Sequence, residues 1–436
     1  MRRSLLRNTG RAFRKLGLTR RWGQLAIAQV ALLSVLLLNW PSTSSSPVVT
    51  LTMVVPSSEA AYWEKVIQTF EVGQDEIRID LIDLAELTPQ KDVTRALKET
   101  CTQSSERVCD IVYLDVIWVP ELAANGALQR LGNLLSSESE SEFIDSEIAA
   151  GEYQGELYRI PFRADFGMLY YQSDLVDQTA LPQTFDELLQ TAPALQLEAG
   201  MPWGYLWQAE GEGLTATFAE VLQGYGGYWI DPTTNAVGLD EPAAVEAVRF
   251  LLRTIELGIS PPLEQVAYTD EEAGVAFERR EAVFMRNWPF VLHSPGDPMS
   301  PASAPIKRVP MALHAEGHTG RSCRGSWGLG IAQRSRHPQQ AWRAIQYLTS
   351  EATQLKFVSE TSYIPSRKEL LRNKTEAIAE AARQAMMRPQ IADYGTASQI
   401  LQRYLASALR NEADPETAMK AAAEETRALL ARRGAV

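Results

Sequence analysis

The segment SPVVTLTMVV (46–55) is a nearly unbroken run of β-branched and apolar residues, which is typical of a buried β-strand. A helix is expected to follow near 59–71, where apolar residues recur on one helical face. The strand IRIDLI (77–82), a helix near 88–100 and the strand DIVYLDV (110–116) then complete a βαβαβ order. Because parallel strands need helical crossovers between them, this order predicts an α/β fold with a parallel or mixed sheet.

The same alternation of strands and helices continues along the rest of the chain. Strands are expected at GELYRIPF (155–162), GMLYYQSDL (167–175) and SWGLGIAQ (326–333), and amphipathic helices at 241–258 and 337–350. With 436 residues, the chain exceeds the length at which a single hydrophobic core usually divides, so two domains are expected. A hydrophobic content of 45% and ten tryptophans exclude a disordered chain.

Residues 1–46 are predicted to be an export signal or an N-terminal membrane anchor. Residues 2–21 carry eight Arg and Lys and no acid, and the uncharged segment LAIAQVALLSVLLLNW (25–40) follows them. This apolar run is shorter than the ~20 residues of a full membrane span, so cleavage and retention both stay open. The basic flank predicts that everything after residue 41 lies outside the cytoplasm, in the periplasm or on the outer face of the cytoplasmic membrane.

The charge and the motifs of the exported part exclude several functions. Without the eight basic residues of the N-terminal segment, the net charge of −12 becomes −20, which disfavours nucleic acid as a partner. The sequence contains no glycine-rich phosphate loop and no G-x-S-x-G, H-E-x-x-H or C-x-x-C motif. The one close histidine pair, His314 and His318, has no acid or cysteine that completes a ligand set, so neither a cofactor nor a metal ion is expected.

The sequence has three cysteines. Cys101 and Cys109 flank the short segment CTQSSERVC, and in an oxidising compartment a disulfide between them is favoured over two buried thiols. Cys323 stands alone and is expected to be a small buried residue, because no base is evident that would activate it as a nucleophile.

Six segments then stand in a characteristic order along the chain. They are SEAAYWEKVIQTF, YLDVIWVPELAANGALQRL, LYRIPFRADFGMLYYQSDL, FMRNWPF, SWGLGIAQRSRHPQQAWRAIQYLTS and YIPSRKEL. Each alone is a weak signal, but together they resemble the extracellular solute-binding proteins (family 1) of ABC sugar importers, most of all the trehalose/maltose-binding group. The resemblance extends from about residue 47 to 432, nearly all of the exported chain.

The resemblance implies a type II periplasmic-binding-protein fold, in which two α/β lobes are joined by a hinge of three crossing segments. The N-lobe would comprise 47–163 and 330–363, and the C-lobe 164–328 and 364–436. In the family, a ligand cleft lies between the lobes and closes on the sugar by hinge motion. The protein would be a monomer without enzymatic activity, and its partners would be the ligand and the ABC permease subunits.

A sugar presents flat C–H faces and a rim of hydroxyl groups, so aromatic rings and charged groups together suit it. The resemblance assigns stacking on the sugar to Trp288, in FMRNWPF, and to Trp327, in RGSWGLG; core packing is the alternative role for both. Phe290 is placed in the same site, where related proteins often carry tyrosine. Ser326 precedes Trp327 where relatives often have glycine.

Four acidic residues are assigned to the ligand by the same resemblance. Asp115 ends an apolar strand, where α/β proteins bind ligands, although a helix cap is its alternative role. Asp165 lies in FRADFG between two strands, where a turn residue is the alternative. Glu59 begins the first helix, so the helix dipole alone would explain it. Glu212, in GEGL, is a weaker candidate for the lining.

Two arginines complete the predicted site. Arg388, in MRPQIADY, matches an arginine–proline pair from which related proteins reach a sugar hydroxyl. Arg163 stands where relatives usually have an aromatic or apolar residue, and it is expected to pair with Asp165 or to reach an additional hydroxyl.

The predicted function is therefore the substrate-binding component of an ABC transporter for a disaccharide or small glucoside. Trehalose, maltose, sucrose and glucosylglycerol all fit this chemistry. Because Phe290, Arg163 and Ser326 depart from the trehalose/maltose pattern, a related glucoside stays open. Two alternatives also stay open: a secreted glycoside hydrolase, which would use two carboxylates across a sugar, and a membrane-tethered sugar sensor.

Overall fold

The computed structural model describes residues 47–87, 93–102, 109–290, 305–361, 363–372 and 374–433. The segment predicted to be an export signal or anchor, 1–46, lies outside these residues. The chain divides into a unit Met1–Val48 and a unit Val49–Val436, and the second unit is described below. In the described ranges, none of the helices combines the length and the apolar composition that a membrane-spanning helix requires.

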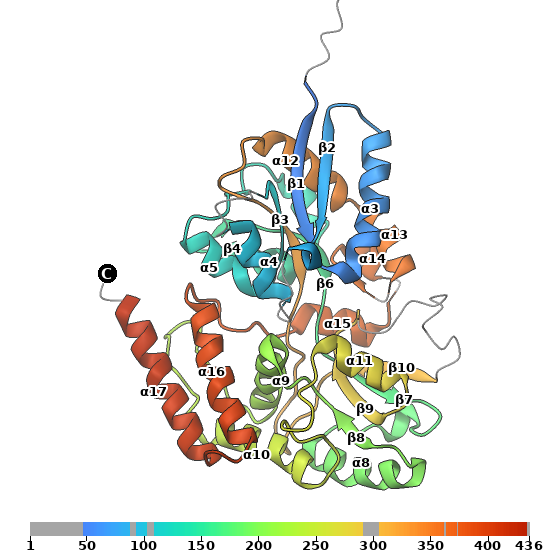
Figure 1. Ribbon diagram of the computed structural model, residues 1–436, viewed down its shortest axis with the longest axis vertical. Coiled ribbons are helices and arrows are strands. Elements are labelled where there is room, and N and C mark those ends of the chain that lie inside the picture. Colours follow the sequence, from blue (N-terminus) through green and yellow to red (C-terminus); the bar gives the residue numbers. More distant parts are fainter. Residues whose placement is uncertain are drawn as a thin grey trace, which may run out of the picture. The chain divides into compact units, whose positions relative to one another are not determined.

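The predicted βαβαβ segment, which follows the N-terminal segment 1–46, forms one half of a six-stranded sheet (Figure 1). From edge to edge, the strands are β12 (Ile364–Pro365), β6 (Ile160–Ala164), β11 (Trp327–Ile331), β3 (Ile111–Asp115), β1 (Val49–Val55) and β2 (Ile77–Asp83). Strand β1 pairs in parallel with β2 and β3, and helices α3 (Ser57–Val72) and α4 (Val93–Thr102) connect these strands. The α/β order predicted from residues 46–116 is therefore confirmed. Strands β6, β11 and β12 complete the sheet through antiparallel pairs.

A second sheet has four strands and a mixed arrangement. Its order is β10 (Ile306–Pro310), β7 (Met168–Gln172), β9 (Ala282–Asn287) and β8 (Trp203–Leu206). Strands β8 and β9 are parallel, whereas β7 is antiparallel to both of its neighbours. A small two-stranded sheet consists of β4 (Glu152–Tyr153) and β5 (Glu156–Leu157).

The chain passes between the two large sheets at three places. It leaves the six-stranded sheet after Ala164 and enters the four-stranded sheet at Met168. It returns between Pro310 and Trp327, and it leaves again after Pro365 toward α15 (Glu376–Gln384), which packs against β10. Strand β11 belongs entirely to the six-stranded sheet. The lobe boundaries given above stay predictions.

Helices pack against the two large sheets, and further helices pack against one another in the second half of the chain. Helix α3 packs against β2, and α12 packs against β1 and β11, while α16 and α17 pack together beside α9 and α10 (Figure 1). The bounds are α5 (Val119–Ala124), α6 (Ser137–Ser141), α7 (Asp145–Ala149), α8 (Phe185–Ala199), α9 (Gly211–Gly224), α10 (Pro242–Glu256), α11 (Asp270–Glu278), α12 (Pro338–Leu348), α13 (Glu351–Glu360), α14 (Lys368–Leu371), α16 (Tyr394–Leu409) and α17 (Pro415–Arg433). Single-turn 3-10 helices occur at Leu84–Glu86, Val116–Trp118 and Gln178–Ala180.

Five strands of the two large sheets are buried along their whole length, which explains why their sequences are mostly apolar. Every residue of β3, β6, β7, β9 and β11 is buried. A strand that is covered on both faces needs no polar side in its pattern. Polar side chains in these strands therefore need partners inside the protein, and several of those partners lie in the site described next.

Cys101, near the end of α4, forms a disulfide bond with Cys109, just before β3. The bridge links the end of α4 to the residue that precedes β3 by two positions. Cys323 is a free, buried cysteine.

Candidate ligand-binding site

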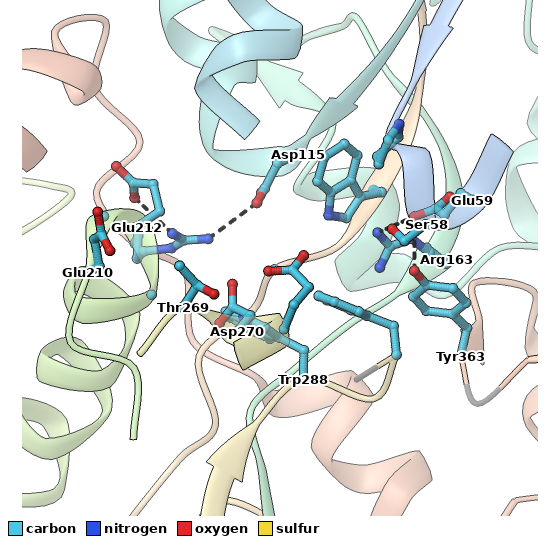
Figure 2. Close-up of a pocket in the computed structure, with 18 residues that line it drawn as sticks. Ser58, Glu59, Asp115, Arg163, Glu210, Glu212, Thr269, Asp270, Trp288 and Tyr363 are labelled. Atoms are coloured by element: carbon cyan, nitrogen blue, oxygen red, sulfur yellow. Dashed lines mark hydrogen bonds and ion pairs between the residues drawn. The ribbon is translucent and has the colours of Figure 1, made fainter. Parts of the chain in front are cut away.

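A cavity lies where the ends of several strands and helices converge, and eighteen residues line it (Figure 2). Its empty volume is about 920 Å³, open solvent at its mouth included. The lining consists of Pro56, Ser58, Glu59, Asp115, Arg163, Glu210, Gly211, Glu212, Gly213, Thr269, Asp270, Glu271, Trp288, Phe290, Gly325, Trp327, Tyr363 and Arg388.

The lining has two chemically different ends. Figure 2 shows Glu59, Arg163 and Tyr363 together on one side, and Glu210, Glu212, Thr269 and Asp270 on the other. The side chains of the first group extend from the first turn of α3, from β6 and from the residue before β12, and those of the second from the beginnings of α9 and α11.

Trp288 follows directly after β9, and the residues before it hold it in place. The Asn287 side chain accepts a hydrogen bond from the Trp288 backbone N–H at 2.8 Å and donates one to the Asp270 carbonyl at 2.8 Å. The Arg286 guanidinium lies over the indole, 4.1 Å from the ring centroid. Two hydrogen bonds to Glu220, at 2.8 and 3.0 Å, fix that guanidinium. The indole is thus supported by a charged group on one face.

Arg163 occupies the aromatic end of the cavity. Its guanidinium carbon lies 4.1 Å from the ring centroid of Tyr363, 5.0 Å from that of Trp327 and 5.5 Å from that of Phe290. A cation within about 6 Å of an aromatic face is attracted by the ring quadrupole. Arg163 is only 2% exposed, although it contributes to the lining.

Glu59 holds Arg163, and all of its accepting capacity is used. Its carboxylate accepts from Trp63 Nε1 (3.2 Å), Tyr113 Oη (2.8 Å), Arg163 Nη2 (3.0 Å) and Tyr363 Oη (2.9 Å). A carboxylate has about four acceptor sites. Glu59 lines the cavity, but no lone pair is left for a sugar hydroxyl in this arrangement.

Asp165, to which the resemblance assigned a contact with the ligand, does not line the cavity. It is 1% exposed and forms an ion pair with Arg163 Nη1, so Arg163 pairs with Asp165 as one of its two expected roles required. Its backbone N–H donates to Ser326 Oγ at 3.1 Å, and its carbonyl accepts from the Gly325 N–H at 2.9 Å. Ser326 also donates to the buried Glu147 at 2.8 Å. The hydroxyl that departs from the family pattern therefore joins two segments that run between the sheets.

Arg388 bridges the two halves of the site. Its guanidinium lies 3.6 Å from Asp115, at the end of β3, and 3.1 Å from Glu212, at the beginning of α9. Glu212 also accepts from Tyr394 (2.7 Å) and Ser398 (2.6 Å), so it is held by several partners. Asp115 accepts a backbone hydrogen bond and keeps further acceptor capacity. Burial raises the pKa of Asp115, and the charge of Arg388 opposes that shift.

The beginning of α11 supplies acidic residues that sequence reasoning missed. Thr269 caps this helix in a capping box with Glu272, which places Asp270 and Glu271 in the cavity wall. Burial, with a smaller contribution from the neighbouring Glu271, raises the pKa of Asp270 to about 7. Burial also raises the pKa of Glu271. The sequence T-D-E-E is a recognisable helix start, but a helix start alone does not show that its residues face a cavity.

The cavity brings together most of the residues that were predicted from the sequence. The lining includes Glu59, Asp115, Glu212, Trp288, Phe290, Trp327 and Arg388, and it excludes Asp165. Their contact with a ligand stays a prediction. Tyr363, Glu210, Gly325 and the α11 residues were missed. In the described part of the chain, no three or more His, Cys, Asp or Glu side chains are grouped to hold a metal ion.

Comparison with known proteins gives a family match over much of the chain. The family described as bacterial extracellular solute-binding proteins matches residues 95–355. The chain is 26% identical over 301 residues to a probable ABC transporter-binding protein of Deinococcus radiodurans, covering 67% of this chain and 70% of that protein. It is 24% identical over 256 residues to the maltotriose-binding protein of Pyrococcus abyssi, covering 58% of this chain and 54% of that protein.

Solved structures show the same fold. Maltose-bound MalE3 of T. maritima is 28% identical and superposes with a TM-score of 0.77, covering 87% of this chain and 99% of that chain. The GacH receptor of Streptomyces glaucescens, 19% identical, has a TM-score of 0.73 and covers 88% of this chain and 99% of its own. The predicted two-lobed, type II periplasmic-binding-protein fold is therefore confirmed. This protein is a solute-binding protein and not an enzyme, and it belongs to the family of bacterial extracellular solute-binding proteins.

Proposed function

We propose that this protein is the substrate-binding component of an ABC importer and that it captures a disaccharide or small glucoside in the cavity. The observation that carries the proposal is the Trp288 indole, which is supported by Arg286 at 4.1 Å and lines the cavity together with several carboxylates. An aromatic ring beside charged hydrogen-bonding groups suits the C–H face and the hydroxyl rim of a sugar. The relative named for maltotriose and the neighbour seen with maltose support a sugar as the solute.

The proposed roles of the lining residues follow from their remaining hydrogen-bonding capacity. Trp288 would stack on one sugar ring. Asp115 and Asp270 would accept hydrogen bonds from sugar hydroxyl groups. The partners of Asp115 do not use all of its lone pairs, and one buried oxygen of Asp270 has no hydrogen-bond partner. Glu59 and Glu212 would instead hold Arg163 and Arg388 in place. A sugar that lacked a matching hydroxyl would leave a buried carboxylate unpaired, which gives the site its selectivity.

The delivery step and the location belong to the same proposal. The loaded protein would present the sugar to the membrane-embedded permease subunits as a monomer, from the periplasm or from the outer face of the cytoplasmic membrane. The lobes would be 47–163 with 330–363 and 164–328 with 364–436, and they would close on the sugar by hinge motion. Trehalose, maltose, sucrose and glucosylglycerol are the candidate ligands.

Calorimetric titration of residues 47–436 with these four compounds tests the proposal. We expect one of them to bind with a Kd on the order of micromolar. Trp288→Ala should weaken that binding more than about tenfold, because the sugar loses its stacking surface. Trp203→Ala is the matched control: this tryptophan begins β8, does not line the cavity, and should leave the affinity unchanged. No heat of binding with any of the four, or equal affinity in the Trp288 variant, would contradict the proposal.

A further inference from the structure

The aromatic end of the cavity is already occupied by a side chain of the protein. The Arg163 guanidinium lies among the rings of Tyr363, Trp327 and Phe290, at 4.1, 5.0 and 5.5 Å from their centroids. These three rings and Arg163 itself all line the cavity (Figure 2). A planar cation thus lies where flat, weakly polar groups of a ligand would otherwise pack.

The guanidinium is held firmly in this position. Glu59 accepts from its Nη2 at 3.0 Å, Tyr113 Oη accepts from its Nε at 2.9 Å, and Asp165 pairs with its Nη1. Two carboxylates compensate one positive charge, so moving the guanidinium aside would leave buried anions without a partner. Arg163 is therefore a fixed part of the wall and not a flexible side chain that a ligand can displace.

Two of the three rings at this end, those of Tyr363 and Trp327, pack against further rings of the protein. Tyr363 stacks on Phe357 at 4.7 Å with an interplanar angle of 11°, so one face meets Phe357 while the guanidinium of Arg163 lies over the ring. Trp327 contacts Tyr113 at 4.9 Å in addition to Arg163. At the other end, Arg286 lies over the ring of Trp288, and this ring also contributes to the lining. Tyr363 and Trp327 thus share one guanidinium and each meet a second ring, whereas Trp288 lies against a separate guanidinium.

We propose that Arg163 fills the place of a further sugar ring and so limits the ligand to one ring stacked on Trp288 plus a small second group. The inference rests on the proposed function and assigns a size class to its ligand. Disaccharides and single-sugar glucosides fit this class, and linear trisaccharides do not. Arg163 is then the residue that determines the specificity for ligand length.

The test compares ligand lengths in the wild-type protein and in two variants of Arg163. The probes are maltotriose and the compound that binds most tightly among trehalose, maltose, sucrose and glucosylglycerol. Arg163→Ala vacates the aromatic end, but it removes the cation from Glu59 and Asp165 and destabilises the fold. Arg163→Lys keeps a cation for both carboxylates and removes the planar group, so this variant decides the question even if the alanine variant does not fold.

A matched control separates the effect on specificity from an effect on stability. Arg367 lies over the ring of Phe143 at 4.4 Å and pairs with Glu142, but it does not line the cavity. Arg367→Ala should lower the melting temperature and leave the ratio of the two affinities unchanged. The measurements are calorimetric titrations at one temperature and a thermal unfolding curve for each variant.

We expect the wild-type protein to bind the short ligand at least about a hundredfold more tightly than maltotriose, and the Arg163 variants to reduce that ratio about tenfold or more. Wild-type binding of maltotriose as tight as that of the short ligand would overturn the inference. So would variants that weaken both ligands equally, although the proposed function would survive either result. A wild-type protein that binds no sugar would instead refute the proposed function and this inference with it.

Discussion

Replacing Glu59 with glutamine separates the two roles that a buried carboxylate in the cavity wall can have. If the group binds the sugar, the variant loses affinity and keeps its stability. If the group positions Arg163, the variant loses stability first. The structure favours the second role, because four protein donors, from Trp63, Tyr113, Arg163 and Tyr363, use both oxygens of Glu59.

The size of the effect follows from the same contacts. Glutamine keeps one oxygen that can accept hydrogen bonds. Its NH₂ group replaces the second oxygen, so it faces hydroxyl or N–H groups that are themselves donors. The negative charge that pairs with Arg163 is also lost. Breaking a buried ion pair costs about 3–5 kcal/mol. Because Asp165 still compensates Arg163 in the variant, we expect a loss of about 2–3 kcal/mol in the free energy of unfolding.

Urea denaturation of the ligand-free protein measures this loss, and calorimetry measures the affinity. Glu64→Gln is the control, because Glu64 lies on the same helix with an exposed side chain and should change neither quantity. We expect the Glu59 variant to weaken sugar binding by less than about tenfold, through a slightly displaced Arg163. An unchanged free energy of unfolding, together with a larger loss of affinity, would refute the positioning role.

Two further predictions concern stability. The pKa of Asp270 is about 7 in the folded protein, raised by burial and by Glu271 from the usual 3.8, so the folded state keeps a proton that the unfolded chain releases. Stability should therefore fall as the pH rises from about 4 to 7. Asp270→Asn should flatten this dependence in melting curves recorded across that range. An identical slope of melting temperature against pH in both proteins would contradict the prediction. The double variant Cys101→Ala/Cys109→Ala lacks the bridge, which joins residues with a sequence separation of 8, and should lose about 2–3 kcal/mol of unfolding free energy. Cys323→Ser removes no bridge, so a reducing agent should lower its stability as much as it lowers that of the wild type. A double variant as stable as the wild type would show that the bridge does not contribute.

The α/β fold was predictable because burial imposes a local pattern on the sequence. The apolar runs 46–55 and 110–116 became the parallel strands β1 and β3, and the helix expected from 241–258 is α10. The antiparallel insertion of β11 between β3 and β6 was not predictable in this way. Hydrophobic periodicity shows that a segment is a buried strand, but it does not show which strands become its neighbours.

The cavity wall was predictable where a short segment has an unusual composition. Trp288 and Asp115 stand at the ends of apolar strands, and both line the cavity. Tyr363 does not stand in a segment of unusual composition. Only the folded chain brings its hydroxyl within hydrogen-bonding distance, 2.9 Å, of Glu59, which is 304 residues away in sequence. Asp270 carried the local signature of a helix start, yet that signature does not tell which helix starts face a cavity.

The sequence by itself determined the order of strands and helices, the acidic charge and the set of aromatic and charged residues available for a site, because these properties are local or additive. Only the tertiary structure decided which of those residues keep free hydrogen-bonding capacity. Glu59, Asp115 and Asp165 are all acids in recognisable positions, but Arg163 pairs with Glu59 and Asp165, whereas Asp115 lies 3.6 Å from Arg388. Whether a buried carboxylate is satisfied depends on segments that approach from far along the chain, and no local pattern records that approach.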